Sequence, residues 1–64
     1  MKKFYKIRLT TDDGRVLYYD ETYNCFGVYH GTLYTNKRKA QAQISFARKY
    51  GTSSTGVFEV VEVL

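Results

Sequence analysis

The chain has 64 residues, enough for one hydrophobic core and too few for a second domain, so we expect a single domain over residues 1–64. Cys25 is the only cysteine and His30 the only histidine, which excludes an internal disulfide and a structural zinc site with four protein ligands. The net charge is +4, and residues 35–51 carry five basic and no acidic side chains, an excess typical of an electrostatic contact surface.

The sequence predicts a soluble protein that does not enter a membrane. No stretch approaches the roughly 20 apolar residues of a membrane span. The N-terminal residues show no charged start followed by an apolar run, so no signal peptide is predicted. The single thiol is typical of a reducing compartment, and these features together predict a cytoplasmic location.

The first predicted structure is a β-hairpin. Residues 3–10 alternate between apolar and polar, and a second β-prone run, residues 15–20, follows Asp12-Asp13-Gly14. A three-residue loop with Gly14 in the left-handed conformation is preferred over a two-residue turn because it gathers the apolar side chains on one face: Tyr5, Ile7, Leu9, Leu17 and Tyr19. The cross-strand pairs of this register are Leu9 with Leu17, Ile7 with Tyr19, Lys6 with Asp20 and Arg8 with Tyr18.

Residues 21–34 leave two alternatives open. Gly27 and Gly31 interrupt the segment, while its aromatic and aliphatic residues suit extended structure. The segment is either an additional short strand or an ordered aromatic loop that crosses to a helix.

A helix is predicted from about Asn36 to Tyr50, with Thr35 as N-cap and Gly51 at the C-cap position. At 100° per residue its apolar face contains Ala40, Gln43, Ile44, Phe46, Ala47 and Tyr50, with Lys39 at the margin. The opposite side, named here the basic helix face, contains Lys37, Arg38, Gln41, Ser45, Arg48 and Lys49. Three cations in the first turn oppose the helix dipole at a cost of a few tenths of a kcal/mol each, so local stability does not explain them.

The last predicted strand, residues 57–64, is apolar on both faces apart from Glu59 and Glu62. Such a strand is either central in its sheet or part of an interface, and an interface at Val57–Leu64 would allow a homodimer. The predicted order β-β-(β)-α-β indicates an α+β fold, with an antiparallel or mixed sheet of three to four strands and one helix packed on one face.

The sequence contains no constellation that favours catalysis. Cys25 and His30 could form a nucleophile pair, but no third group at a recognisable spacing would orient them. Turn formation accounts for the neighbouring carboxylates Asp12 and Asp13. We therefore predict a protein that is not an enzyme and that carries no cofactor and no metal.

The basic helix face is the first candidate binding surface. Its cations would line a stripe about 15–20 Å long, which fits several phosphates of a duplex or an acidic groove on a protein. Acidic residues are normally interspersed on a solvated helix face, and none occurs here. A face that is merely solvated remains the alternative.

The outer face of the hairpin is the second candidate. This outer sheet face interleaves aromatic, aliphatic and basic residues: Phe4, Lys6, Arg8, Val16 and Tyr18. Exposed aromatic residues flanked by cations are typical of sheets that stack single-stranded bases. An ordinary two-sided sheet would show the same residues, and the aromatic signature of RNA-recognition motifs is absent.

The segment Tyr34–Ala40, followed by Ile44 and by Phe58–Val63, resembles small accessory proteins of phages and mobile elements from low-GC Gram-positive bacteria. Those proteins often begin with Met-Lys-Lys and a Tyr-rich hairpin and end with a Glu/Val strand. The resemblance implies a protein that binds and modulates or inhibits a host protein, as anti-CRISPR and other anti-defence proteins do. Inhibitors that mimic DNA are acidic, whereas this chain is basic.

We therefore expect a non-catalytic binding module that acts on a host protein through the basic helix face. The alternative is a small basic nucleic-acid-binding protein that uses the same face or the outer sheet face. A further alternative is a structural or assembly protein that self-associates through Val57–Leu64.

Overall fold

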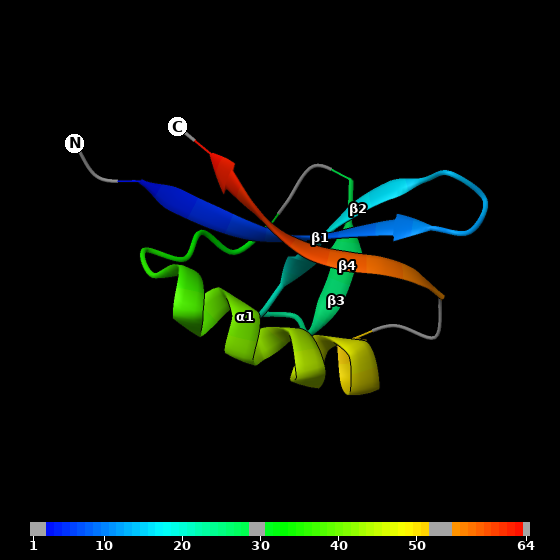
Figure 1. Ribbon diagram of the computed structural model, residues 1–64. Coiled ribbons are helices and arrows are strands. Elements are labelled where there is room, and N and C mark those ends of the chain that lie inside the picture. Colours follow the sequence, from blue (N-terminus) through cyan, green and yellow to red (C-terminus); the bar gives the residue numbers. More distant parts are fainter. Residues whose placement is uncertain (1–2, 29–30, 52–54, 64) are drawn as a thin grey trace.

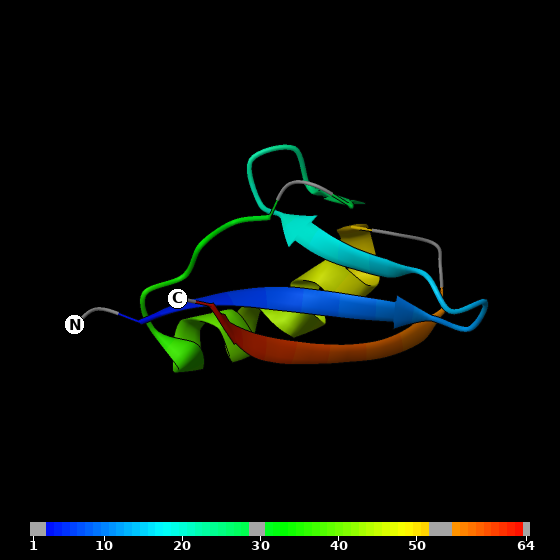
Figure 2. The same cartoon turned by 90° about the horizontal axis from the view of Figure 1, so that it is seen from above.

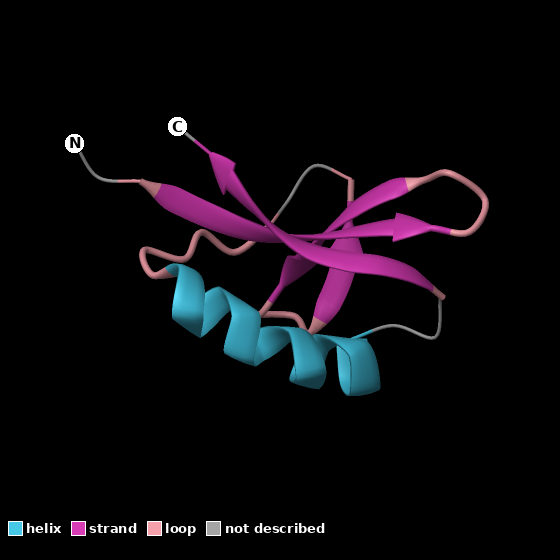
Figure 3. Cartoon of the chain, viewed as in Figure 1, coloured by secondary structure: helices cyan, strands magenta, loops and turns pink. Residues whose placement is uncertain are grey.

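The computed structural model describes residues 3–28, 31–51 and 55–63. Within these residues the elements are β1 (Phe4–Thr11), β2 (Val16–Asp20), β3 (Cys25–Gly27), α1 (Lys37–Phe46), a π-helical turn η1 (Ala47–Gly51) and β4 (Gly56–Val63). The described strands form a four-stranded antiparallel sheet in the order β3-β2-β1-β4. The helix lies on one face of this sheet (Figures 1 and 3), so the predicted α+β fold is confirmed.

The hairpin turn has the predicted three-residue loop. Leu9 lies opposite Leu17, and the amide of Thr11 donates to the carbonyl of Arg15 at 2.8 Å. Gly14 has a φ of +88°, in the left-handed region that glycine enters without a steric cost. The loop therefore sets the register of β1 and β2 next to the turn.

Beyond the turn, β2 separates from β1, and residues 31–34 lie between the two strands (Figure 2). Tyr34 and Tyr5 exchange two main-chain hydrogen bonds, each 2.8 Å long. On the other side of the segment, the amide of Thr32 donates to the carbonyl of Tyr19 at 2.9 Å. The segment thus acts as a short spacer that is bonded to both strands.

This spacer makes two predicted cross-strand pairs wrong. The β1–β2 ladder ends before Ile7 and Tyr19 pair, although both side chains are fully buried in the same core. Asp20 does not lie opposite Lys6; its carboxylate instead accepts the amide of Thr22 at 2.9 Å. A turn contact between near neighbours in the chain therefore replaces the expected contact between strands.

Of the two alternatives for residues 21–34, the additional short strand is confirmed. β3 pairs antiparallel with β2, and Phe26 lies opposite Tyr19. The hydroxyl of Tyr19 donates to the side-chain oxygen of Asn24 at 2.8 Å, which ties the turn before β3 to the core. Asn24 has a φ of +50°, a conformation that asparagine tolerates better than most residues.

The helix differs from its prediction at both ends. Asn36, not Thr35, is the N-cap, and its side-chain oxygen accepts the amide of Arg38 at 2.8 Å. The α-helix ends at Phe46 and continues as η1 to Gly51. A π-helical turn closes its hydrogen bonds over five residues instead of four, so residues after Phe46 rotate away from their positions on an ideal helix.

The core lies between α1 and the helix-facing side of the sheet. Its buried residues are Ile7, Leu9, Tyr19, Tyr34, Ala40 and Ala47. Of the predicted apolar helix face, Ile44 packs against this core, but Phe46 is 48 % exposed. The core assignment of Phe46 is wrong because Ala47 points at the sheet, and Phe46 is rotated from it by about 100°. The side chain of Tyr50, which is predicted to lie on the apolar face, is outside the part of the structure that is described.

The last strand is at the edge of the sheet, not at its centre. β4 pairs with β1 along its full length, from Phe4 opposite Val63 to Thr11 opposite Gly56. β1 and β2 are the strands with neighbours on both sides, so the sheet order excludes the central alternative for β4. Leu64, the last residue of the predicted strand, lies outside the described residues.

Candidate functional site

The side chains of the basic helix face lie at the surface: Lys37, Arg38, Gln41, Ser45, Arg48 and Lys49 are all exposed. The Asn36 cap places Lys37 and Arg38 in the first turn of α1, which contains no acidic residue. Because the N-terminus of a helix carries a partial positive charge, these two cations add to a local positive potential. The first turn is therefore a concentrated cationic site on a rigid element.

Three acidic side chains of the described residues form ion pairs on the sheet and its hairpin loop. Ion pairs there join Arg8 to Glu59, Lys3 to Glu62 and Arg15 to Asp13. In residues 3–28, 31–51 and 55–63, no ion pair reaches Lys37 or Arg38. The charges of Lys37 and Arg38 are thus not ion-paired within the described part of the chain, whereas Lys39, the third cation of this turn, lines a groove together with Glu21.

Arg48 is exposed, but its guanidinium contacts the edge of the sheet. Its guanidinium lies 5.1 Å from the ring centroid of Phe58, in β4. The ring of Phe58 also makes an edge contact with Phe26, at 5.8 Å between centroids, on the helix-facing side of the sheet. Arg48 belongs to η1 and directly follows the buried Ala47, so it flanks the sheet-facing side of the helix.

The cations of the outer sheet face are held by other residues of this chain. The Nε of Arg8 donates to Glu59 at 3.0 Å, and this hydrogen bond is the main reason that the pKa of Arg8 is raised. The ammonium of Lys6 lies 5.1 Å from the ring centroid of Tyr18. Because Lys6 lies over the Tyr18 ring, a base could stack on that side of the ring only if the ammonium moved away.

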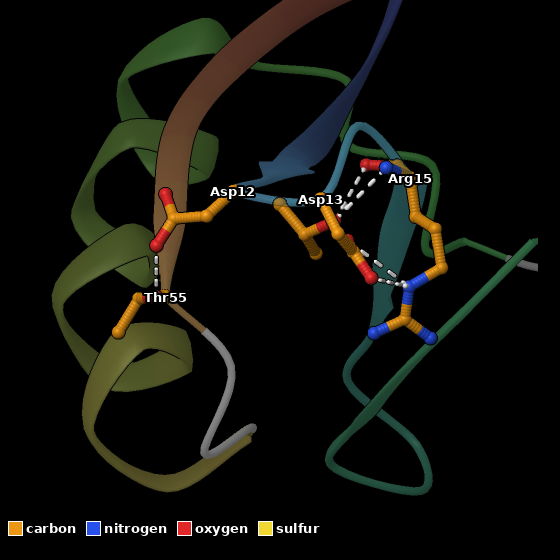
Figure 4. Close-up of a pocket in the computed structure, with 5 residues that line it drawn as sticks. Asp12, Asp13, Arg15 and Thr55 are labelled. Atoms are coloured by element: carbon orange, nitrogen blue, oxygen red, sulfur yellow. Dashed lines mark hydrogen bonds and ion pairs between the residues drawn. The ribbon is translucent and has the colours of Figure 1, made fainter.

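A pocket of about 200 Å³ lies at the hairpin tip (Figure 4). The residues that line it are Thr11, Asp12, Asp13, Arg15 and Thr55. The hydroxyl of Thr55 donates to Asp12, and the amide of Asp12 donates to the carbonyl of Thr55 at 3.2 Å. These contacts tie the hairpin loop to the start of β4.

The second carboxylate of this pocket is also engaged. Asp13 accepts the hydroxyl of Thr11, and the Nε of Arg15 donates to it at 3.1 Å. The hydroxyl contact and then the guanidinium lower the pKa of Asp13. The Asp13 carboxylate therefore stabilises the turn, as the sequence predicts, whereas the Asp12 carboxylate bonds Thr55 outside the turn.

A second groove, of about 410 Å³, was not predicted from the sequence. It is lined by Glu21, Tyr34, Lys39, Ala42 and Gln43. Tyr34 is only 8 % exposed, and among the described residues its buried hydroxyl has no hydrogen-bond partner. Burial, and next the nearby Glu21, raise the pKa of Tyr34. No sequence signal marks this groove because its residues come from three separate segments.

The candidate nucleophile pair cannot be assembled from the described residues. Cys25 is exposed in β3, and His30 lies outside the description. Among residues 3–28, 31–51 and 55–63, no group of three or more His, Cys, Asp or Glu side chains comes together as a metal site would require.

Comparisons with known proteins give no relative for this chain: no family model, no curated protein and no solved structure matches it. Among the described residues, none of the helices has the length and apolar character needed to cross a membrane.

Proposed function

We propose that this chain is a non-catalytic binding module that docks on an acidic protein surface through the basic helix face. Lys37 and Arg38 are the principal contacts. The proposal rests on one observation: three exposed cations occupy the first turn of α1, against the helix dipole, and no described acidic side chain forms an ion pair with Lys37 or Arg38.

The arrangement on α1 suits a protein contact. Gln41 and Ser45 follow the cations along the same exposed side of the helix and can donate and accept hydrogen bonds. The helix is held to the sheet by Ala40 and Ala47, so the stripe is presented on a rigid support. Carboxylates on a partner would compensate both the side-chain charges and the dipole, which favours association and fast encounter.

The resemblance to phage and mobile-element accessory proteins indicates the setting. The partner is then a host protein in the bacterial cytoplasm, and binding would modulate or inhibit it. A polymerase, a replication factor and a defence nuclease are targets of this kind. Proteins that handle nucleic acid often carry acidic catalytic clusters, which would be complementary to the cations of α1.

A pull-down with matched variants tests the proposal. Tagged wild-type chain is incubated with a Gram-positive lysate, with and without nuclease, at two salt concentrations. K37Q/R38Q removes the two proposed contacts. K3Q/R15Q removes the same charge from two other exposed side chains, which are 60 % and 62 % exposed. We expect one stoichiometric protein that survives nuclease, is lost with K37Q/R38Q and is retained with K3Q/R15Q.

A charge-reversal variant separates binding from folding. K37E/R38E should abolish partner binding while it stabilises α1 by about 0.3–1 kcal/mol per residue, because acidic side chains complement the helix N-terminus. Thermal unfolding measures the second effect. Capture of the same protein by wild type, K37Q/R38Q and K37E/R38E alike would contradict the proposal.

A second candidate is nucleic-acid binding through the same cations, since the first turn also fits phosphates. The outer sheet face favours this less, because its Arg8 is paired with Glu59 and its Lys6 lies over Tyr18. Titration of duplex DNA at several salt concentrations distinguishes the two functions. Phosphate binding would give a log–log slope of about −0.9 per neutralised phosphate, lost in K37Q/R38Q.

A further inference from the structure

The two edges of the sheet differ in length and protection. One edge is β3, which has three residues. The other is β4, which has eight residues and pairs with β1 without a bulge. β4 contains no proline and no lysine, the residues that commonly prevent an edge strand from pairing with another chain.

The hydrogen bonds of Tyr5 show which main-chain groups of β4 are unpaired. The amide and carbonyl of Tyr5 both bond to Tyr34, so they point away from β4. Glu62, which lies opposite Tyr5, therefore directs its own amide and carbonyl away from β1. By alternation the same holds for Phe58 and Val60. Among the described residues, no segment pairs with this edge.

We propose that β4 pairs antiparallel with β4 of a second copy of this chain, about a two-fold axis at Val60. Two outward-directed residues must face each other in such a pair, which limits the choice of register. An axis at Glu59 would set two Glu59 carboxylates opposite each other, which is destabilising. The axis at Val60 avoids this and uses the full strand. It pairs Val60 with Val60, Phe58 with Glu62, Glu59 with Val61, and Val57 with Val63 across the axis.

Charge complementarity supports this register. Phe58 and Glu62 of the partner subunit would form a hydrogen-bonded pair, with Cα atoms about 5.5 Å apart. Arg48 already lies over the ring of Phe58, on the helix-facing side of the sheet. Glu62 has its side chain on that same side, where it meets Lys3 at 3.6 Å. Each Arg48 is thereby brought next to Glu62 of the partner subunit, twice in the symmetric dimer.

The chain that pairs with β4 is a second copy of this protein, because the edge of β4 is complementary to its own two-fold related copy. In this register the apolar Val57 of one subunit lies opposite the apolar Val63 of the other. The guanidinium of Arg48, which lies over Phe58, comes next to the carboxylate of Glu62 of the partner subunit. The pairing also extends the four-stranded sheet into one continuous sheet across both subunits. This inference goes beyond the proposed function, since it concerns the edge of β4 and not the first turn of α1.

Amide hydrogen exchange over a concentration series tests the pairing in the unmodified chain. In the dimer, the amides of Phe58, Val60 and Glu62 become hydrogen-bonded, so their exchange should slow by at least about tenfold as concentration rises. The amides of Glu59 and Val61 already bond to β1, so their exchange should slow less than that of the three outward-directed amides. Sedimentation equilibrium should show the mass rising from 7.5 kDa to twice that value. A constant 7.5 kDa into the millimolar range would overturn the proposal.

A charge swap tests the register. E62K places a lysine opposite Arg48 of the partner subunit and should raise the dimer dissociation constant by about 100-fold, since two contacts are lost. R48E should act similarly. The double variant R48E/E62K restores opposite charges and should recover dimerisation to within about threefold of wild type. Arg48 and Glu62 do not pair within one chain, so the recovery reports on the contact between subunits.

Loss of the dimer can be separated from unfolding of a less stable variant. Thermal unfolding at concentrations below the dissociation constant measures the fold of each monomer separately. A dimer that both single variants leave intact would overturn the edge contact. Protection of the Phe58, Val60 and Glu62 amides that does not depend on concentration would also overturn it. K37Q/R38Q should leave the dimer unchanged, so failure here and failure of the proposed function are distinguishable.

Discussion

Tyr5 and Tyr34 exchange two main-chain hydrogen bonds, each 2.8 Å long, on the side of β1 where β2 would otherwise continue. This contact holds residues 31–34 between the two strands. It also anchors the chain just before Asn36, the N-cap of α1. The position of the cationic first turn relative to the sheet therefore depends on a bond between two residues far apart in the sequence.

Replacement of Gly31 should disturb this spacer. A Cβ atom at Gly31 would lie 2.9 Å from the Cβ of Tyr18, closer than packed side chains allow. We expect Gly31→Ala to lower the free energy of unfolding by about 1–3 kcal/mol, because the spacer must move away from β2. Urea denaturation measures the change. Gly27→Ala is the control, since nothing lies within 4 Å of a Cβ there; equal losses in both variants would contradict the explanation.

The two buried tyrosine hydroxyls should respond in opposite ways to removal. Tyr34→Phe removes a hydroxyl that has no partner among the described residues, so stability should be unchanged or rise by up to about 1 kcal/mol. Tyr19→Phe removes a hydrogen bond to Asn24 and should cost about 0.5–1.5 kcal/mol. Thermal unfolding of both variants checks the contrast. A larger loss for Tyr34→Phe would indicate that its hydroxyl has a partner in solution.

Substitutions at the two neighbouring residues Thr35 and Asn36 should differ in their effect on stability, because only Asn36 caps the helix. Asn36→Ala removes the side-chain oxygen that accepts the amides of Arg38 and Lys39, and should cost about 0.5–2 kcal/mol. Thr35→Ala should be close to neutral, because Thr35 is exposed and does not cap the helix. Circular dichroism during denaturation reports both changes. The reverse order would place the cap at Thr35, as the sequence alone predicts.

The hairpin loop should make stability depend on pH in the acid range. The Thr11 hydroxyl and then Arg15 lower the pKa of Asp13 below its ordinary value of 3.8. A lowered pKa in the folded state means that the ionised carboxylate stabilises the fold above about pH 4, and that this contribution disappears as pH falls through the folded-state pKa. The melting temperature of wild type should therefore exceed that of D13N at pH 7. The difference should shrink toward pH 2, and a difference that does not change with pH would contradict this role.

Much of the fold could be predicted from short-range patterns. The Asp-Asp-Gly loop and the alternation around it predict the hairpin and its register at Leu9 and Leu17, which the structure confirms. The periodicity of residues 36–50 predicts the helix, with its N-cap misplaced by one residue. Asparagine and threonine both cap helices, and the preference for asparagine is too small to decide between two neighbouring positions.

The surfaces could be predicted only in part. The exposure of Lys37 and Arg38 follows from helical periodicity, and it is observed. The contact of Arg48 with Phe58 could not be predicted, since it joins residues of η1 and β4 that are brought together only by the packing of the helix on the sheet. The groove beside Tyr34 could not be predicted either, because separate segments form it.

The sequence by itself determined the α+β class, the turn at Gly14 and the cationic side of α1. These features depend on residues within a few positions of each other, whose conformational preferences and periodicity act locally. Only the tertiary structure decided that β4 is an edge strand, that residues 31–34 separate β2 from β1, and that Arg48 lies over Phe58. Each of these features joins residues distant in the chain, so it depends on how the whole core packs and not on local preference.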